Sequence, residues 1–168
     1  MRQFSLAVGA TAFIAYLLLA PSVSGMGDSS EWTLVLATNG VAHPTGYPLY
    51  TLLGHLSCRL LHAFGVSWPS AANAWSALGG AIAVALLHAV TLELTEAGLG
   101  MGVRTRQFVA LLPTALFAVQ PITLREATAA EVNIWSAAWT CGAGYAFVRL
   151  LRGIESSQIG RASCRERV

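Results

Sequence analysis

The sequence predicts an all-α, polytopic membrane protein: a bundle of about four transmembrane helices, with an in-plane amphipathic helix in the first outer loop. Hydrophobic residues make up 55% of the 168 residues and charged residues only 11%. A soluble domain carries about 25% charged residues. Four apolar stretches also approach the roughly 20 residues that cross a bilayer. The three cysteines and the net charge of +2 favour neither a disulfide scaffold nor a nucleic-acid partner.

The four predicted spans differ in character. The first, residues 4–23, carries no charge, and a signal peptide cleaved near Ser24 is the alternative interpretation. The second, residues 71–92, is rich in alanine and glycine, which let helices approach closely in lipid, so we expect it inside the bundle. The third, residues 108–122, is short and contains Pro113, which favours a kink. The fourth covers residues 132–151.

A further apolar run, residues 47–64, has leucines at helical spacing and a polar stripe of His55, Arg59 and His62. Burying Arg59 at mid-bilayer would cost on the order of 3 kcal/mol. We therefore expect a helix that lies in the membrane interface within an outer loop, residues 25–70, with its polar stripe toward water.

The arginines predict the orientation of the chain. If residues 47–64 do not cross the membrane, five arginines share one side; they are Arg2, Arg104, Arg106, Arg149 and Arg152. The positive-inside rule makes that side cytoplasmic. We expect an integral, multi-pass membrane protein with a cytoplasmic N-terminus. The absence of lysine hints at a bacterial inner membrane.

The last ten residues, 159–168, resemble the translation of a sequencing-library adapter over ten codons. We therefore expect residues 1–158 to be the native N-terminal part of a membrane domain, and the chain to be a fragment. A basic cytoplasmic tail is the alternative. Without these ten residues the chain has seven arginines and seven acidic residues, so its formal net charge is zero.

Charged residues at the predicted outer ends of the spans are candidates for chemistry. Asp28 and Glu31 follow the first span, where an i, i+3 helical spacing would place them on one face as a base and a helper. The same pattern is also typical of a helix N-cap. Glu131 lies directly before the fourth span, where charge is costly without a function or a partner. Arg125 could pair with Glu126 or bind a phosphate.

A stiff turn precedes the predicted interfacial helix. Pro44 and Pro48 restrict the backbone and Gly46 tolerates positive φ, so the turn would present His43 and Tyr47. A simple helix start with Pro48 in its first turn is the alternative.

Other conspicuous side chains have structural interpretations. Trp32, Trp68 and Trp135 fit anchors at the outer interface better than platforms for a sugar. His88 lies in the second span, and we expect it to bond to a neighbouring helix.

Four segments together carry a resemblance to a known family. They are Asp28-Ser29-Ser30-Glu31-Trp32, then Gly40 to Leu53 with His43-Pro44-Thr45-Gly46-Tyr47-Pro48-Leu49-Tyr50 at its centre, then Asn73-Ala74-Trp75-Ser76-Ala77-Leu78, and finally Arg125 to Asn133. In order and spacing, residues 5–152 resemble multispanning membrane proteins related to protein O-mannosyltransferases, which are glycosyltransferases of the GT-C type.

The resemblance implies an all-helical membrane fold that transfers a sugar from a polyprenyl- or dolichyl-phosphate donor to an acceptor on the non-cytoplasmic face. It makes Asp28 the general base and Glu31 its helper. His43 and Tyr47 would shape the donor phosphate pocket, and Glu131 would line the cavity.

Arg125 is added from its charge alone, because a lipid phosphate leaving group needs charge stabilisation. No cofactor is implied. His43, Asp28 and Glu131 could meet around a divalent ion, but no ligand spacing requires one.

GT-C enzymes have many more spans than four. We therefore expect the chain by itself to be inactive and the complete protein to be a glycosyltransferase. The alternative is a small non-enzymatic four-helix membrane protein that binds a lipid or a partner subunit. A transporter is less favoured, because the acidic residues gather outside the spans. The sequence does not indicate the sugar or the acceptor.

Overall fold

The computed structural model describes residues 2–24, 27–42, 47–98 and 101–165, with side chains except at 2, 97–98 and 155–165. Within these ranges the chain forms seven helices and no strand, which confirms the all-α class. The helices are α1 (Arg2–Leu19), α2 (Ser29–Thr38), α3 (Pro48–Ala63), α4 (Trp68–Gly98), α5 (Val103–Val119), α6 (Pro121–Thr128) and α7 (Asn133–Arg165).

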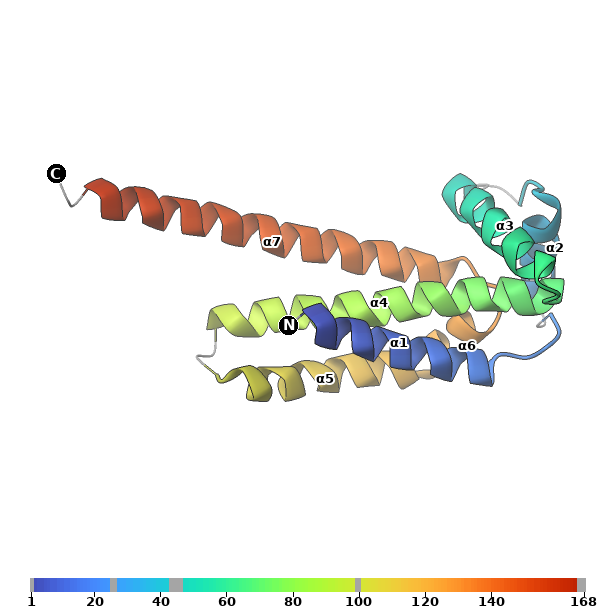
Figure 1. Cartoon of the computed structure of the whole chain (residues 1–168), viewed down its shortest axis with the longest axis horizontal. Helices are drawn as coiled ribbons and strands as arrows, with labels where there is room; N and C mark the ends of the chain where they lie inside the picture. The colour runs from blue at the N-terminus through green and yellow to red at the C-terminus, as the bar shows by residue number, and fades with distance from the viewer. Residues whose placement is uncertain (1, 25–26, 43–46, 99–100, 166–168) are drawn as a thin grey trace.

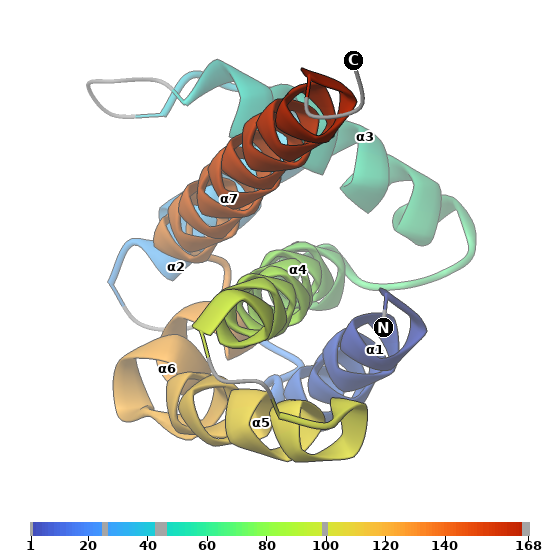
Figure 2. The same cartoon turned by 90° about the vertical axis from the view of Figure 1, so that its left-hand side faces the viewer.

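Helix α4 is the centre of the bundle and contacts all six other helices. Figure 2, which looks along the bundle, shows α1, α5 and α7 arranged around it. Its small side chains allow this, and many are buried, including Ala71, Ala72, Ala77 and Ala83. At the crossing with α1, a Cβ added to Gly9 would lie 2.8 Å from the Cβ of Ala85, so only glycine permits this approach. The predicted interior position of residues 71–92 is confirmed.

Two predicted helix boundaries need correction. Helix α1 ends at Leu19 rather than at residue 23; Pro21 follows, and the residue before a proline is disfavoured in helical conformation. The Pro21 carbonyl then accepts a hydrogen bond from Nδ2 of Asn73 at 2.8 Å, which ties the end of α1 to α4. Helix α7 begins one residue after the predicted start but continues beyond residue 151 to Arg165.

The predicted third span is broken, but not at Pro113. Helix α5 continues through Pro113 and ends at Val119. Gln120 is extended (φ −63°, ψ 145°) because Pro121 follows it, and α6 then departs at 65° from α5. The predicted kink site is therefore wrong by two helical turns.

By length and composition, one described helix could cross a membrane: Trp68–Glu96, 29 residues with a mean hydropathy of 1.8. Helices α5 and α6 would supply a second only if the bent pair acts as one span. The four predicted spans are therefore not confirmed.

Helix α3 confirms the helix predicted over residues 47–64, and it lies with α2 at one end of the bundle (Figure 1). Its leucines are exposed, among them Leu49, Leu52, Leu56 and Leu60. The polar stripe is not wholly turned to water, however. His55 is half-buried, and its Nδ1 donates to the Leu36 carbonyl at 2.7 Å. Carbonyls in the last turn of a helix lack partners within the helix, and His55 supplies one to α2.

The end of the bundle away from α2 and α3 is held by ion pairs. Arg149 Nη1 lies 3.2 Å from Glu93, and Arg152 contacts both Glu93 and Glu96. Arg106 Nη1 lies 3.4 Å from Glu96. Three of the five arginines expected on one side of the membrane therefore gather at one end of the bundle.

Candidate functional site

Asp28 precedes α2 and does not cap it. Its backbone is helical (φ −69°, ψ −14°), and its carbonyl accepts a hydrogen bond from the Trp32 N–H at 2.9 Å. Its exposed carboxylate makes no capping hydrogen bond, so the N-cap interpretation of this motif is not supported. Glu31 lies one turn later in the first turn of α2 and is half-buried.

Glu131 is fixed by the central helix. It lies in the short link between α6 and α7, and its N–H donates to the Ser76 hydroxyl at 2.9 Å. The same hydroxyl donates to the Glu131 carbonyl at 3.2 Å. Because Ser76 is fully buried in α4, this double contact pins the link to the end of the bundle that carries α2 and α3.

The Glu131 carboxyl lies within the electrostatic reach of Asp28. The pKa of Glu131 is raised to about 7, first by burial and then by the negative charges of Glu126 and Asp28, against the opposing charge of Arg125. Asp28 comes from the first predicted outer loop and Glu131 from the second. The fold thus brings Asp28, Glu131 and Arg125 to the same end of the bundle.

Glu126 is a member of this site that sequence reasoning treated only as a partner of Arg125. Its carboxylate is buried, and it accepts hydrogen bonds from Arg125 Nη2 at 2.5 Å and from Asn133 Nδ2 at 3.1 Å. The predicted Arg125–Glu126 pair is confirmed. The Arg125 side chain is nevertheless 73% exposed. The sequence carries no signal for the contact with Asn133, because it depends on the link between α6 and α7.

Tyr47 holds an unusual backbone conformation directly before α3. Its φ of 37° and ψ of 60° lie in the left-handed region, which costs a residue other than glycine about 1–2 kcal/mol. Its ring meets that of Trp32 edge-on at 5.6 Å, so Tyr47 packs against α2. His43, predicted with Tyr47 to shape a phosphate pocket, lies outside the described residues.

Two of the three expected membrane anchors are core residues instead. Trp32 is buried at the end of the bundle, and Trp135 is buried in a stack with Trp75, with ring centroids 4.1 Å apart. The indole nitrogen of Trp135 donates to the Trp75 carbonyl at 3.1 Å. It also packs over Gly79, where an added Cβ would lie 2.8 Å away. Buried indoles cannot serve at a lipid interface, so the anchor prediction is wrong for Trp32 and Trp135.

The expected hydrogen bond from His88 to a neighbouring helix is confirmed. It is fully buried, and its Nδ1 lies 2.9 Å from the Ser5 hydroxyl on α1.

A small cavity opens between the start of α3 and the start of α7, beside Glu131. It measures about 220 Å³, and we call it the aromatic slot; it is lined by Tyr47, Pro48, Leu49, Tyr50, Val132, Trp135, Ser136 and Trp139. Tyr50 is buried and solvent does not reach its hydroxyl; the Ser76 hydroxyl acts on it, although no hydrogen bond of ordinary geometry joins the two. Trp139 is 58% exposed at the other side of the slot.

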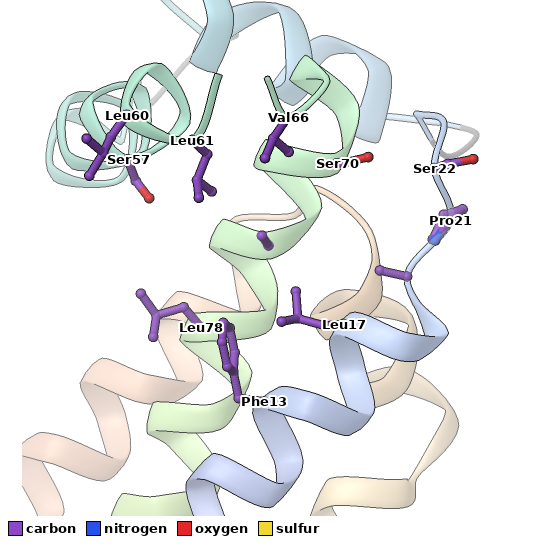
Figure 3. Close-up of a pocket in the computed structure, with 12 residues that line it drawn as sticks. Phe13, Leu17, Pro21, Ser22, Ser57, Leu60, Leu61, Val66, Ser70 and Leu78 are labelled. Carbon is purple, nitrogen blue, oxygen red and sulfur yellow. The ribbon is translucent and has the colours of Figure 1, made fainter. Parts of the chain in front are cut away.

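A larger hollow of about 600 Å³ lies elsewhere, between the end of α1, α3 and α4 (Figure 3). Its walls are apolar apart from hydroxyl groups, with Phe13, Leu17, Leu60 and Leu78 among the lining residues. Because no charged side chain lines it, it is unsuited to proton transfer or to binding a phosphate. Among the described residues, no group of three His, Cys, Asp or Glu side chains could hold a metal ion.

Fold and site together define a class: an all-α protein with a helix of membrane-spanning length and with crowded carboxylates at one end of its bundle. The family model of the protein O-mannosyl-transferase TMEM260 N-terminal domain matches residues 28–154, and the chain belongs to this family. The resemblance inferred from the sequence motifs is thereby confirmed.

Two relatives illustrate the match. The chain is 32% identical over 128 residues to the protein O-mannosyl-transferase TMEM260 of Mus musculus, which covers 76% of this chain and 17% of the relative. It is 46% identical over 50 residues to the protein O-mannosyl-transferase tmem260 of Dictyostelium discoideum, which covers 29% of this chain and 6% of the relative. The chain thus spans about a sixth of the mouse protein. No solved structure matches it.

Proposed function

We propose that this chain forms the acceptor-activating part of a membrane O-mannosyltransferase that uses a polyprenyl- or dolichyl-phosphate sugar as donor and a protein hydroxyl as acceptor. Membership of the family supports the reaction class. The observation that supports the assignment of the site is the electrostatic interaction of Asp28 with Glu131 at one end of the bundle, although the two lie about a hundred residues apart in the sequence.

In this proposal Asp28 is the general base. Its exposed carboxylate takes the proton from the acceptor hydroxyl while the hydroxyl oxygen forms a bond to C1 of the sugar. The bond between C1 and the lipid phosphate oxygen breaks, and the phosphate leaves with the electron pair. Glu31, one helical turn along, helps to position Asp28. No general acid is required, because a phosphate is already a good leaving group.

Arg125 stabilises the leaving phosphate. Glu126 occupies one side of its guanidinium, whereas most of the side chain is exposed and can face a second anion. In this proposal Tyr47 and His43 complete the phosphate pocket. Glu131 lines the cavity in which donor and acceptor meet. No metal is invoked in these steps.

We further propose that the arginine-rich end of the bundle is cytoplasmic and the carboxylate end is not. Arg106, Arg149 and Arg152 at one end agree with the positive-inside rule. Helices α1 and α7 would then join α4 and the α5–α6 pair as membrane segments, with α3 in the interface, where its exposed leucines can enter lipid. The bacterial inner membrane and the adapter origin of residues 159–168 stay predictions.

The test is mannosyl transfer by the complete protein with Asp28→Asn. General-base catalysis contributes about 10²- to 10⁴-fold, so we expect transfer to fall by at least about 100-fold while the protein folds and inserts normally. Transfer is followed with a labelled lipid-phosphate mannose and an acceptor peptide.

Ser30→Ala is the matched control. Ser30 lies in the same turn, is exposed and donates only a local hydrogen bond to the Gly27 carbonyl at 3.2 Å. It should leave transfer within about twofold, since surface changes of this kind have small effects. Equal activity of Asp28→Asn and the wild type would exclude Asp28 as the base.

A further inference from the structure

Another hollow on α3 adjoins the larger hollow of Figure 3, and the proposed reaction uses neither of them. It measures about 560 Å³, and we call it the α3 hollow; it is lined by Leu53, Leu56, Ser57, Arg59, Leu60 and Trp75. Ser57 and Leu60 also line the larger hollow, so the two hollows share a wall on α3. Among the described residues, Arg59 is the only charged side chain that lines either hollow.

Arg59 is a cation without an acidic partner. Its side chain is exposed, and no ion pair among the described residues involves it. By contrast, Arg149 and Arg152 at the opposite end of the bundle both meet Glu93. A guanidinium presents a planar fork of N–H donors that matches the oxygens of a phosphate. Arg59 can therefore bind an anionic group that the described chain does not supply.

The larger hollow continues from α3 along the bundle. Figure 3 shows Phe13 and Leu17 of α1 beside Leu78 of α4, and Leu60 lies at the end that carries α3. The lining residues of α4 run from Ser70 to Leu78, a rise of about 12 Å along the helix. Because α4 is long and apolar enough to cross a membrane, this hollow runs in the direction of the acyl chains of a bilayer.

Charge and polarity together select the occupant of the two hollows. A neutral lipid would leave Arg59 without an anion, whereas a free phosphate or an acidic peptide would leave the larger hollow without an apolar group. An anionic phospholipid supplies both a negatively charged headgroup and an acyl chain, and arginines near a bilayer surface attract such lipids. The exposed leucines beside Arg59, Leu56 and Leu60, suit the same surroundings.

The sugar donor of the proposed reaction is a different lipid phosphate. Its phosphate meets Arg125 in that reaction, and Arg125 lines neither hollow. Asp28 and Glu131 do not line them either. The occupant is therefore a lipid that the reaction does not consume.

We propose that the two hollows bind an anionic phospholipid of the bilayer, with its headgroup phosphate on Arg59 and one acyl chain in the larger hollow between α1 and α4. This inference rests on the proposed function, because it requires the proposed placement of α3 in the membrane interface.

The test is a titration of the complete protein in detergent with phosphatidylglycerol and, separately, with phosphatidylcholine that carries the same acyl chains. Native mass spectrometry resolves the bound lipid and gives each Kd. Phosphatidylglycerol should bind about fivefold more tightly, which is what one arginine near an anionic headgroup contributes. Arg59→Gln should remove this preference, and Arg59→Lys should keep most of it because the charge remains.

Ala74→Leu tests the position of the acyl chain. Ala74 lines the larger hollow and is half-buried, so a leucine at this position would fill part of the space. Both lipids should bind several-fold more weakly, while the preference for phosphatidylglycerol remains. Unchanged affinities would exclude the acyl chain from this hollow and overturn the proposal.

Arg104→Gln is the matched control for the charge. Arg104 is also exposed and belongs to no ion pair among the described residues, but it lies near the start of α5 at the opposite end and lines neither hollow. It should leave the preference unchanged. A preference that survives Arg59→Gln, or that Arg104→Gln reduces equally, would overturn the proposal.

Other occupants give distinct results in the same spectra. Displacement of phosphatidylglycerol by a short-chain prenyl-phosphate mannose would make the hollows a donor site, and a dimer that forms in place of the lipid complex would make them an interface between copies. Either result would overturn the proposal.

The two proposals can fail separately. If Asp28→Asn abolishes transfer but lipid binding shows no preference that depends on Arg59, the phospholipid site is wrong and the reaction stands. If Arg59→Gln removes the preference but Asp28→Asn transfers normally, the assignment of the base is wrong and the phospholipid site stands.

Discussion

The two ends of the bundle treat their carboxylates in opposite ways. At the end formed by the C-terminal part of α4, Glu93 and Glu96 meet Arg106, Arg149 and Arg152, and every described carboxylate there has an arginine partner. At the end formed by α2, α3 and the link between α6 and α7, the charges of Glu126 and Asp28 raise the pKa of Glu131. Among the described residues, Arg125 is the cation that opposes them.

This difference separates a structural charge cluster from the candidate site. Paired charges lower one another's energy and hold α4, α5 and α7 together, and they need no ligand. Crowded carboxylates raise one another's proton affinity, and groups with a perturbed pKa cluster at functional sites. Helix α4 therefore carries a structural ion-pair cluster at one end, formed by Glu93 and Glu96 with their arginine partners, and a candidate site at the other.

Disrupting the ion-pair cluster should give the largest change in stability. Glu93→Gln removes the charged partner that Arg149 and Arg152 share. We expect the free energy of unfolding to fall by about 3 kcal/mol, because the arginines are left beside a neutral amide. Unfolding in detergent followed by circular dichroism measures it.

Glu96→Gln is the matched change at the same end. The Glu96 side chain is 38% exposed against 10% for Glu93, and Arg152 keeps Glu93 as a partner. The buried Arg106 loses a charged partner but keeps the amide oxygen of the glutamine as an acceptor. Its loss should stay below about 1 kcal/mol. Equal losses for the two variants would mean that the cluster is not organised around Glu93.

Glu131→Gln should change how stability depends on pH at the opposite end. The pKa of Glu131 is raised from 4.5 to about 7 in the folded chain, so folding favours the protonated form. The stability that the protonated Glu131 carboxyl contributes is fully present below pH 4.5 and is lost as the pH rises through about 7. Relative to Glu131→Gln, which stays neutral, the wild type should lose about 2 kcal/mol over this range, allowing for solvent screening.

The measurement is the free energy of unfolding of both proteins between pH 4 and pH 8. Parallel profiles would show that Glu131 titrates normally and that the site end is no more strained than the other end.

Glu126→Gln should give the smallest of these effects, a change in the pKa of Glu131. The negative charge of Glu126 is the largest electrostatic contribution to the raised pKa of Glu131, after burial. Its removal should lower that pKa, so the loss of stability should still begin near pH 4.5 but should be smaller and end at a lower pH. Carbon-13 NMR titration of the labelled Glu131 carboxyl measures this directly, and an unchanged midpoint would place Glu126 outside the reach of Glu131.

Several features could be predicted because the local sequence determines them. The helix over residues 47–64 follows from its leucine spacing, and the interior position of α4 follows from its small residues. The candidate acids Asp28 and Glu131 could be selected because charge at the edge of an apolar segment is costly. The buried pairing of Glu126 with Asn133 could not be selected, because it depends on the geometry of the link between α6 and α7.

Other features escaped prediction for a different reason. A tryptophan near a predicted span end looks the same in the sequence whether it faces lipid or stacks on a neighbour. Trp135 stacks on Trp75 only because Gly79 leaves room for its indole. The kink expected at Pro113 falls at Gln120 instead, because the proline at 121 acts on its preceding residue.

The sequence by itself determined the all-α class and the central helix and selected the candidate residues, because apolar periodicity and the cost of charge are local properties. Tertiary structure decided which charges meet. The packing of α2, α3 and the link between α6 and α7 around one end of α4 brings Asp28 within reach of Glu131 and opens the aromatic slot beside them. Electrostatic interaction depends on distance in space, and distance along the chain does not fix it.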